Sequence, residues 1–187
     1  MRILYATDGS EGGLSTARFL AGLSAQRDIH VHIVAVLDPK DPGDGSAVLT
    51  HARSALGEFA GDVTTATGRG NSTSAIVDFL LRTADDENAD LIALGASGTS
   101  AVARFFLGSV AESVARHSQH SVLVTRSLKE PLQKVIIGFD GSECARAAAE
   151  FAVTKFPLPL DCTLSVNSVV PQPIFGVAGD PSYPMTP

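Results

Sequence analysis

The sequence predicts an α/β fold, a doubly wound sheet of five parallel strands with helices on both faces. Apolar runs of strand length alternate with segments of helical periodicity along the first two thirds of the chain. These runs are continuously apolar, which is typical of parallel strands buried on both faces. A third observation, an internal repeat, adds a partial second copy of the same unit.

The expected elements follow one another as strand and helix. In the helix that begins near Ser74, Ile76, Phe79, Leu80 and Ala84 recur at helical spacing. Right-handed crossovers then bring the carboxyl ends of the strands to one edge of the sheet, where ligands of such folds bind. The expected strands are Arg2–Ala6, His30–Leu37, Val63–Ala66, Leu91–Leu94 and Ser121–Thr125, and the expected helices are Glu11–Ala25, Ala47–Phe59, Ser74–Asp85 and Ser109–His117.

Composition narrows the class of protein. The chain has 187 residues, of which 44% are hydrophobic, and this is enough for a sizeable core. A net charge of −6 argues against nucleic acid as a partner. We expect no membrane association, because no apolar run approaches the ~18 residues of a membrane span. The first strand follows Met1 without a signal-like segment, so the expected location is the cytoplasm.

Cysteine and histidine give no metal or redox motif. Cys144 and Cys162 are far apart in the sequence, and both are expected to be buried core residues. His30 with His32, and His117 with His120, form pairs that no carboxylate or cysteine joins at ligand spacing. We therefore predict no metal site.

One glycine motif carries the chemistry. Gly95-Ala96-Ser97-Gly98 follows an apolar strand, and Gly108-Ser109-Val110 opens a helix after a further nine residues. Glycines let backbone N–H groups approach an anion closely, and a helix N-terminus adds partial positive charge. No lysine follows the glycines, so this is not a Walker A loop. The spacing predicts a phosphate-binding loop.

The segment GASGTSAVARFFLGSVAESVARHSQHSVLVTR resembles the C-terminal signature of the universal stress protein family, and ILYATDGS is similar to the family's first strand. The resemblance covers residues 1–127 and implies a Rossmann-like fold of the HUP type. In that family, G-x2-G-x9-G-[ST] marks the members that bind ATP. The implied ligand is therefore ATP, ADP or AMP, with Mg²⁺ as an optional companion.

The resemblance also implies positions for the nucleotide. Asp8, at the end of the first strand, matches the family's Asp beneath the nucleoside, although Asp-Gly-Ser is also ordinary helix-cap chemistry. Val36 matches the position whose backbone meets the adenine edge. Arg104 could contact the phosphates, but a side chain exposed to solvent is the favoured interpretation. The candidate nucleotide-binding residues are Ala6, Thr7, Asp8, Val36, Gly95, Ala96, Ser97, Gly98, Gly108, Ser109 and Val110.

The internal repeat divides the chain. Val135–Glu143 restates Ile3–Glu11, and the pairs Phe19/Phe151 and Pro39/Pro171 continue the correspondence without a gap. The interpretation is a first unit at 1–127, a linker at 128–134 and a truncated second unit, strand-helix-strand with a loose tail, at 135–187. Either this half unit docks on the first unit or on another chain, or the sequence is a fragment of a longer tandem protein, which is favoured.

Three functions remain open. The first is an adenine-nucleotide-binding regulatory protein in the stress response; the others are a slow ATPase and a nucleotide-free dimerisation scaffold. No catalytic residues are predicted, because no Ser-His-Asp set or pair of carboxylates surrounds the loop. Universal stress proteins commonly pair through their fifth strand, so a homodimer through Ser121–Thr125 is expected, since an apolar edge strand seeks a partner.

Overall fold

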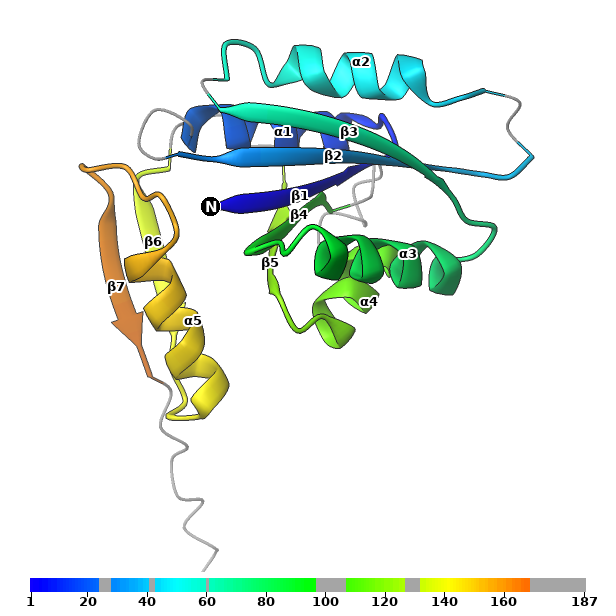
Figure 1. Ribbon diagram of the computed structural model, residues 1–187. Coiled ribbons are helices and arrows are strands. Elements are labelled where there is room, and N and C mark those ends of the chain that lie inside the picture. Colours follow the sequence, from blue (N-terminus) through cyan, green and yellow to red (C-terminus); the bar gives the residue numbers. More distant parts are fainter. Residues whose placement is uncertain (24–27, 41–42, 60, 97–106, 127–131, 169–187) are drawn as a thin grey trace, which may run out of the picture.

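The computed structural model describes residues 1–23, 28–40, 43–59, 61–96, 107–126 and 132–168. Its first unit is a five-stranded parallel sheet in the order β3-β2-β1-β4-β5 (Figure 1). A separate two-stranded parallel sheet, β6-β7, follows. The elements are β1 (Arg2–Thr7), α1 (Glu11–Leu23), β2 (His30–Leu37), α2 (Ser46–Ala55), β3 (Asp62–Arg69), α3 (Thr73–Asp86), β4 (Leu91–Gly95), α4 (Ser109–His117), β5 (Ser121–Thr125), β6 (Lys134–Gly138), α5 (Glu143–Thr154) and β7 (Thr163–Asn167).

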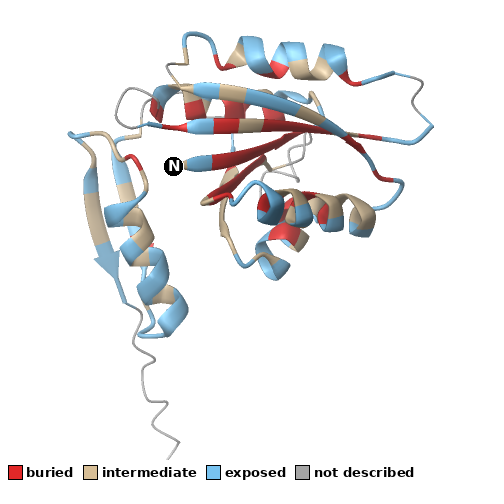
Figure 2. Cartoon of the chain, viewed as in Figure 1, coloured by how far each residue is buried: buried red, intermediate tan, exposed pale blue. Residues whose placement is uncertain are grey.

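The two faces of the large sheet are covered by different helices. Helices α1 and α2 lie on one face and α3 and α4 on the other (Figure 1). One hydrophobic cluster joins Ile3 and Tyr5 of β1 to Leu20 of α1, and a second joins Leu4 to Leu80 of α3. Successive residues of β1 therefore point into opposite cores, and the central strands are buried (Figure 2). The doubly wound fold predicted from the sequence is confirmed.

The strand order creates a switch point between β1 and β4. The chain winds outward from β1 through β2 to β3 and then returns to β4 on the other side of β1. The helices that follow β1 and β4, α1 and α4, lie on opposite faces of the sheet, as they do at a topological switch point (Figure 1). Both strands end at the same edge, with Thr7 and Gly95 as their last residues.

The pairing of β6 with β7 differs by one residue from the pairing of β1 with β2 at the expected repeat offset. The Thr163 N–H donates to the Gln133 carbonyl at 2.8 Å, as the His30 N–H donates to the Met1 carbonyl at 2.9 Å. Gln133 is the repeat equivalent of Met1, but Thr163 lies one residue beyond the equivalent of His30. The expectation of a gapless correspondence through Pro39/Pro171 is therefore wrong after α5, because there is one residue more between the starts of α5 and β7 than between the starts of α1 and β2.

This shift decides which side chains share a face of the small sheet. Ile137 pairs with Val166, and Ile136 pairs with Ser165. Ile137 is 8% exposed, whereas Ile136, on the opposite face, is 58% exposed. The face that carries Ile136 is otherwise polar. On the other face Ile137 is buried, but its partner Val166 is 56% exposed, so the small sheet is only partly covered (Figure 2).

Helix α5 brings the second unit against the first. Phe151 and Phe156 pack on the α1-side core, and the Lys155 ammonium lies 3.3 Å from the Asp90 carboxylate. An apolar groove of about 380 Å³ runs between the units, where Val122 of β5 and Val135 of β6 are among its lining residues.

The cysteines differ from expectation. Cys144 is exposed and Cys162 is half-buried, and both are free thiols. The prediction of two buried core cysteines is wrong, because the face of α5 that carries Cys144 has no layer over it. In the described part of the chain, no helix is long and apolar enough to cross a bilayer.

Candidate functional site

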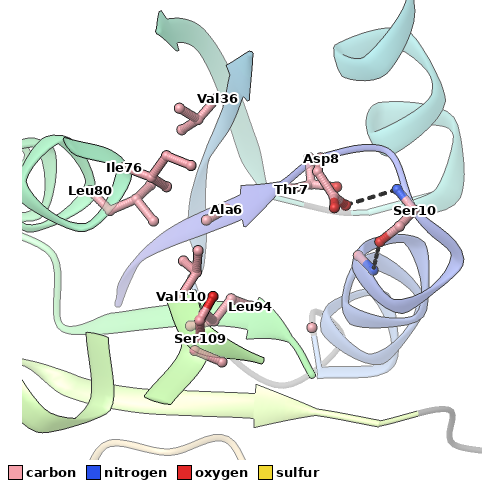
Figure 3. Close-up of a pocket in the computed structure, with 13 residues that line it drawn as sticks. Ala6, Thr7, Asp8, Ser10, Val36, Ile76, Leu80, Leu94, Ser109 and Val110 are labelled. Carbon is pink, nitrogen blue, oxygen red and sulfur yellow. Dashed lines mark hydrogen bonds between the residues drawn. The ribbon is translucent and has the colours of Figure 1, made fainter. Parts of the chain in front are cut away.

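A cavity of about 260 Å³ opens at the switch point, beyond the carboxyl ends of β1 and β4 (Figure 3). Its floor is the sheet face that α3 and α4 cover, and side chains from both helices form one wall. The turn after β1 forms the opposite rim. The lining residues are Ala6, Thr7, Asp8, Ser10, Gly13, Val36, Ile76, Leu80, Leu94, Gly95, Ser109, Val110 and Ala111.

One half of the cavity is apolar. Val36 projects from β2, Ile76 and Leu80 from α3, and Val110 from α4 (Figure 3). The side chain of Leu80 is 1% exposed, so this wall is continuous with the α3-side core. A flat, weakly hydrated ring system would gain free energy by replacing water here.

The opposite rim is a polar turn that begins α1. The Ser10 N–H donates to Asp8 Oδ1 at 2.9 Å, and the Gly13 N–H donates to Ser10 Oγ at 3.4 Å. The Gly9 N–H donates to Thr7 Oγ1 at 3.1 Å. These bonds satisfy donors that the first turn of a helix leaves without intrahelical partners. Asp8 is nonetheless exposed at the cavity, where its carboxylate can also accept hydrogen bonds from a ligand.

The second unit contains the same turn without the cavity. The Ser142 N–H donates to Asp140 Oδ1 at 2.9 Å, and the Ala145 N–H donates to Ser142 Oγ at 3.1 Å. The side-chain and backbone hydrogen bonds from Ser142 lower the pKa of Asp140, because they stabilise its carboxylate. The cap function therefore belongs to the Asp-Gly-Ser motif itself. What distinguishes Asp8 is the cavity beside it.

The amino terminus of α4 supplies the donors on the side of β4. Gly108 is the N-cap, and no side chain caps the helix within the described residues. Among the described residues, no side chain accepts a hydrogen bond from the first-turn N–H groups of α4, and the helix dipole favours an anion there. Ser109 Oγ adds a hydroxyl at the same place, 3.4 Å from Thr73 Oγ1 of α3.

Most predicted site residues meet at this cavity. Ala6, Thr7, Asp8, Val36, Gly95, Ser109 and Val110 line it, while Ala96 and Gly108 are adjacent in the chain to lining residues. The Ala96 N–H donates to the Thr125 carbonyl at 2.8 Å, which ties the end of β4 to β5. Ser97, Gly98 and Arg104 lie outside the described residues.

Sequence reasoning missed the wall formed by α3. Ile76 and Leu80 were recognised as a core-facing stripe, but nothing in their periodicity marks that stripe as part of a ligand site. Ser10, Gly13, Leu94 and Ala111 were also missed, although each lies within five residues of a predicted position in the sequence.

The family profile of the universal stress proteins matches residues 1–126. The chain belongs to the universal stress protein family. Among the relatives, a putative universal stress protein of Staphylococcus aureus (strain USA300) is 32% identical over 145 residues, which cover 69% of this chain and 86% of that protein. A universal stress protein of Methanocaldococcus jannaschii is 27% identical over 146 residues, 69% of this chain and 84% of that protein.

Solved structures of universal stress proteins share the fold. One, a complex with cAMP, is 27% identical with a TM-score of 0.51 and covers 68% of this chain and 98% of its own. A protein of Archaeoglobus fulgidus in complex with dAMP has a TM-score of 0.53 at 22% identity, covering 67% and 98%. Another from the same organism has a TM-score of 0.70 at 19% identity and covers 97% of this universal stress protein and 68% of its own chain.

Metal ligands were tested separately. Within the described residues of this universal stress protein, no three His, Cys, Asp or Glu side chains come together to hold an ion. Each predicted histidine pair instead contains one ion pair: His30 Nδ1 lies 3.2 Å from Asp62, and His120 Nε2 lies 2.8 Å from Asp85. The sequence has no carboxylate at ligand spacing from either histidine pair. The fold nevertheless brings the carboxylate of Asp62 to His30 and that of Asp85 to His120.

Proposed function

We propose that this universal stress protein binds an adenine nucleotide, ATP, ADP or AMP, in the cavity at the switch point and acts as a regulatory protein in the stress response. The observation that carries the proposal is one cavity that joins an apolar wall to an uncapped helix N-terminus. These are the two surfaces that a purine base and a phosphate require. The cAMP and dAMP complexes of similar universal stress proteins support an adenine nucleotide as the ligand class.

Each part of the cavity suits one part of such a ligand. The apolar wall of Val36, Ile76 and Leu80 would hold the base. The Asp8 carboxylate would accept hydrogen bonds from the ribose hydroxyls, and the first-turn N–H groups of α4 with Ser109 Oγ would donate to the phosphate. The described residues offer no cage for Mg²⁺, so a Mg²⁺ ion would be held mainly by the phosphates and water.

Regulation is favoured over catalysis by the chemistry of the rim. Rapid phosphoryl transfer uses metal ligands, cationic side chains and a positioned base. Asp8, the ionisable residue that lines the cavity, is engaged through Oδ1 in the turn before α1. Ordinary enzymes turn over on the order of 1 s⁻¹ or faster, and we therefore expect a hydrolysis rate well below that value. A turnover in that range would favour the ATPase, and absence of nucleotide binding would favour the scaffold.

Filling the cavity tests the proposal. Ala6→Leu adds an apolar side chain at a small residue of the floor, where it would occupy the space of the base. Calorimetric titration with ATP, AMP and GTP should show adenine-nucleotide binding that falls by about tenfold or more in this variant, a difference of about 1.4 kcal/mol.

The matched control is Ala115→Leu, which makes the same change at an exposed position of α4. It should leave the affinity unchanged. Equal affinities of Ala6→Leu and the wild type would place the nucleotide elsewhere, and failure of the wild type to bind any nucleotide would refute the proposal.

Association through β5 is the second part of the proposed function. β5 is the last strand of the large sheet, and among the described residues its outer edge has no strand partner. Pairing of Ser121–Thr125 with the same strand of a second copy would satisfy these backbone groups in an isologous homodimer. Light scattering should report a dimer, with slow amide exchange in β5; a monomer at high concentration with rapid exchange there would overturn it.

A further inference from the structure

His120 lies in the connection between α4 and β5 and has a partner at each ring nitrogen. Nδ1 is 2.8 Å from the carbonyl oxygen of Ala89, and Nε2 is 2.8 Å from Oδ1 of Asp85. The side chain of His120 is 19% exposed, whereas that of Asp85 is 71% exposed. One half-buried imidazole thus bridges the last turn of α3, the connection between α3 and β4, and the start of β5.

Both partners of this imidazole are hydrogen-bond acceptors. A neutral imidazole has one N–H donor and one lone-pair acceptor, so it can satisfy only one of them. The imidazolium donates from both nitrogens and satisfies both. When the proton is lost, the Nδ1–H bond to Ala89 can remain, but Nε2 then presents a lone pair to the Asp85 carboxylate. Asp85 is exposed enough to turn into solvent, so the contact with α3 is the one released.

Several charged groups lie around this pair. Asp86 and Glu87 follow Asp85 at the exposed end of α3 and add negative charge near the imidazole. Other groups on the packed elements have partners of their own. Asp90 accepts the Arg2 N–H and lies near Lys155, His117 Nδ1 lies 2.8 Å from the Ser113 carbonyl oxygen, and Arg116 pairs with Glu112. Arg82 is an exposed cation on α3.

Helix α3, whose last turn contains Asp85, forms part of the apolar wall of the cavity. Ile76 and Leu80 of α3 and Val110 of α4 line the cavity, and Ser118 and His120 follow α4 directly. Fixing the last turn of α3 to the α4–β5 connection therefore limits how far α3 can move from α4 and from the base-binding wall. Asp85 and His120 touch no part of the cavity, so they act by positioning.

We propose that His120 and Asp85 form a proton-dependent positioning pair, closed when His120 is protonated, which holds α3 in place and makes nucleotide affinity decrease as the pH rises. The effect on affinity rests on the proposed function, whereas the effect on folding stability does not. For an ion pair with one exposed partner, the expected change in affinity between the open and the closed pair is about two- to fivefold.

The decisive variant is Asp85→Asn. Its side-chain amide can donate an N–H to a neutral Nε2 or accept an N–H from a protonated one, so the contact persists at every pH. His117→Gln, which removes a histidine at the end of α4, is the matched control. Thermal unfolding of the nucleotide-free protein and ATP affinity are measured at pH 5.5, 7.0 and 8.5. Ratios between variant and wild type at each pH remove the titration of ATP itself.

The expected result is that the wild type loses stability and ATP affinity relative to Asp85→Asn as the pH rises, and that His117→Gln follows the wild type. Parallel profiles of the wild type and Asp85→Asn would overturn the proposal. Diverging stability with parallel affinity would overturn the coupling to the cavity. If no variant binds ATP while the stability profiles diverge, the proposed function fails and the proton-dependent pair stands.

Discussion

Gly95, the last residue of β4, lies so close to Gly12 in the first turn of α1 that a Cβ on Gly95 would be 2.5 Å from the carbonyl carbon and oxygen of Gly12. The strand end and the helix backbone meet here without a side chain between them. Gly95 belongs to the motif that predicts a phosphate loop, yet its lack of a side chain is already required by packing. The rim of the cavity is thus set by backbone contact.

Gly95→Ala should be strongly destabilising. The clashing atoms belong to the backbone of α1, which cannot rotate away, so strand and helix must separate. We expect a loss of about 1–3 kcal/mol in the free energy of unfolding, measured by urea denaturation. Gly138→Ala is the control, because a Cβ at that strand position in β6 meets nothing within 4 Å. If both variants unfold at the same urea concentration as the wild type, the contact with Gly12 is not restrictive.

A buried hydroxyl pair joins α1 to β5. Thr16 Oγ1 and Thr125 Oγ1 are 2.6 Å apart, and both residues are buried. Thr16→Val leaves the Thr125 hydroxyl without this partner and should cost about 1–3 kcal/mol. Thr125→Val should cost less, since Thr16 can still donate to the Gly12 carbonyl at 3.3 Å. In a double-mutant cycle by chemical denaturation, the double variant should lose less free energy of unfolding than the two single variants lose together. Strictly additive losses would contradict the pairing.

Gly68 determines how closely α3 approaches β3. A Cβ on this buried glycine would lie 2.5 Å from Cε1 and 2.9 Å from Cδ1 of Phe79. Gly68→Ala should displace the Phe79 ring, lower the free energy of unfolding by about 1–2 kcal/mol and weaken nucleotide binding through the α3 wall. Adding Phe79→Leu should restore part of both losses. An equal or greater loss in the double variant, measured by thermal unfolding and calorimetry, would show that the ring is not the obstacle.

The fold was predictable because its determinants are local in the sequence. The apolar runs of β1, β2, β4 and β5 coincide with strands of the large sheet. Strand β3 is instead threonine-rich and mostly exposed, and it extends beyond the predicted Val63–Ala66. The candidate site was predictable where a motif or the family resemblance marked a position, as for Asp8 and Val36. The wall of Ile76 and Leu80 was not, since a core-facing helix stripe has the same pattern whether or not a cavity lies beside it.

The second unit shows the limit of reasoning from a repeat. The run of identical residues is the turn 140–143 that leads into α5, and up to this turn the register holds. After α5 no identical residue constrains the alignment strongly, and one additional residue between the starts of α5 and β7 moves β7 by one position. Because strand side chains alternate, this single residue exchanges the two faces of β7. The exposure of Cys144 was missed for a related reason: α5 is apolar enough to suggest burial, but has no second layer over it.

Tyr5 makes the stability of the fold depend on pH in the alkaline range. Its side chain is fully buried, and its hydroxyl donates to the Gly13 carbonyl at 2.7 Å. Burial raises the pKa of Tyr5 from 10.0 to about 12, because the phenolate would lose its hydration in the core. A pKa that is higher in the folded state than in the unfolded state means that the associated stability is fully present below about pH 10 and is lost as the pH rises toward 12.

Tyr5→Phe isolates this contribution. At pH 8 it should cost about 1 kcal/mol, because the hydrogen bond to Gly13 is lost. Between pH 9 and pH 11.5 the wild type should lose stability faster than the variant, by about 1–2 kcal/mol in total, since only the wild type must keep a phenol protonated in its core. Lysines titrate in the same range in both proteins, so the difference between their urea unfolding free energies at each pH removes that contribution. A difference that stays constant across this range would mean that the Tyr5 hydroxyl is ionised in the folded protein as readily as in the unfolded chain.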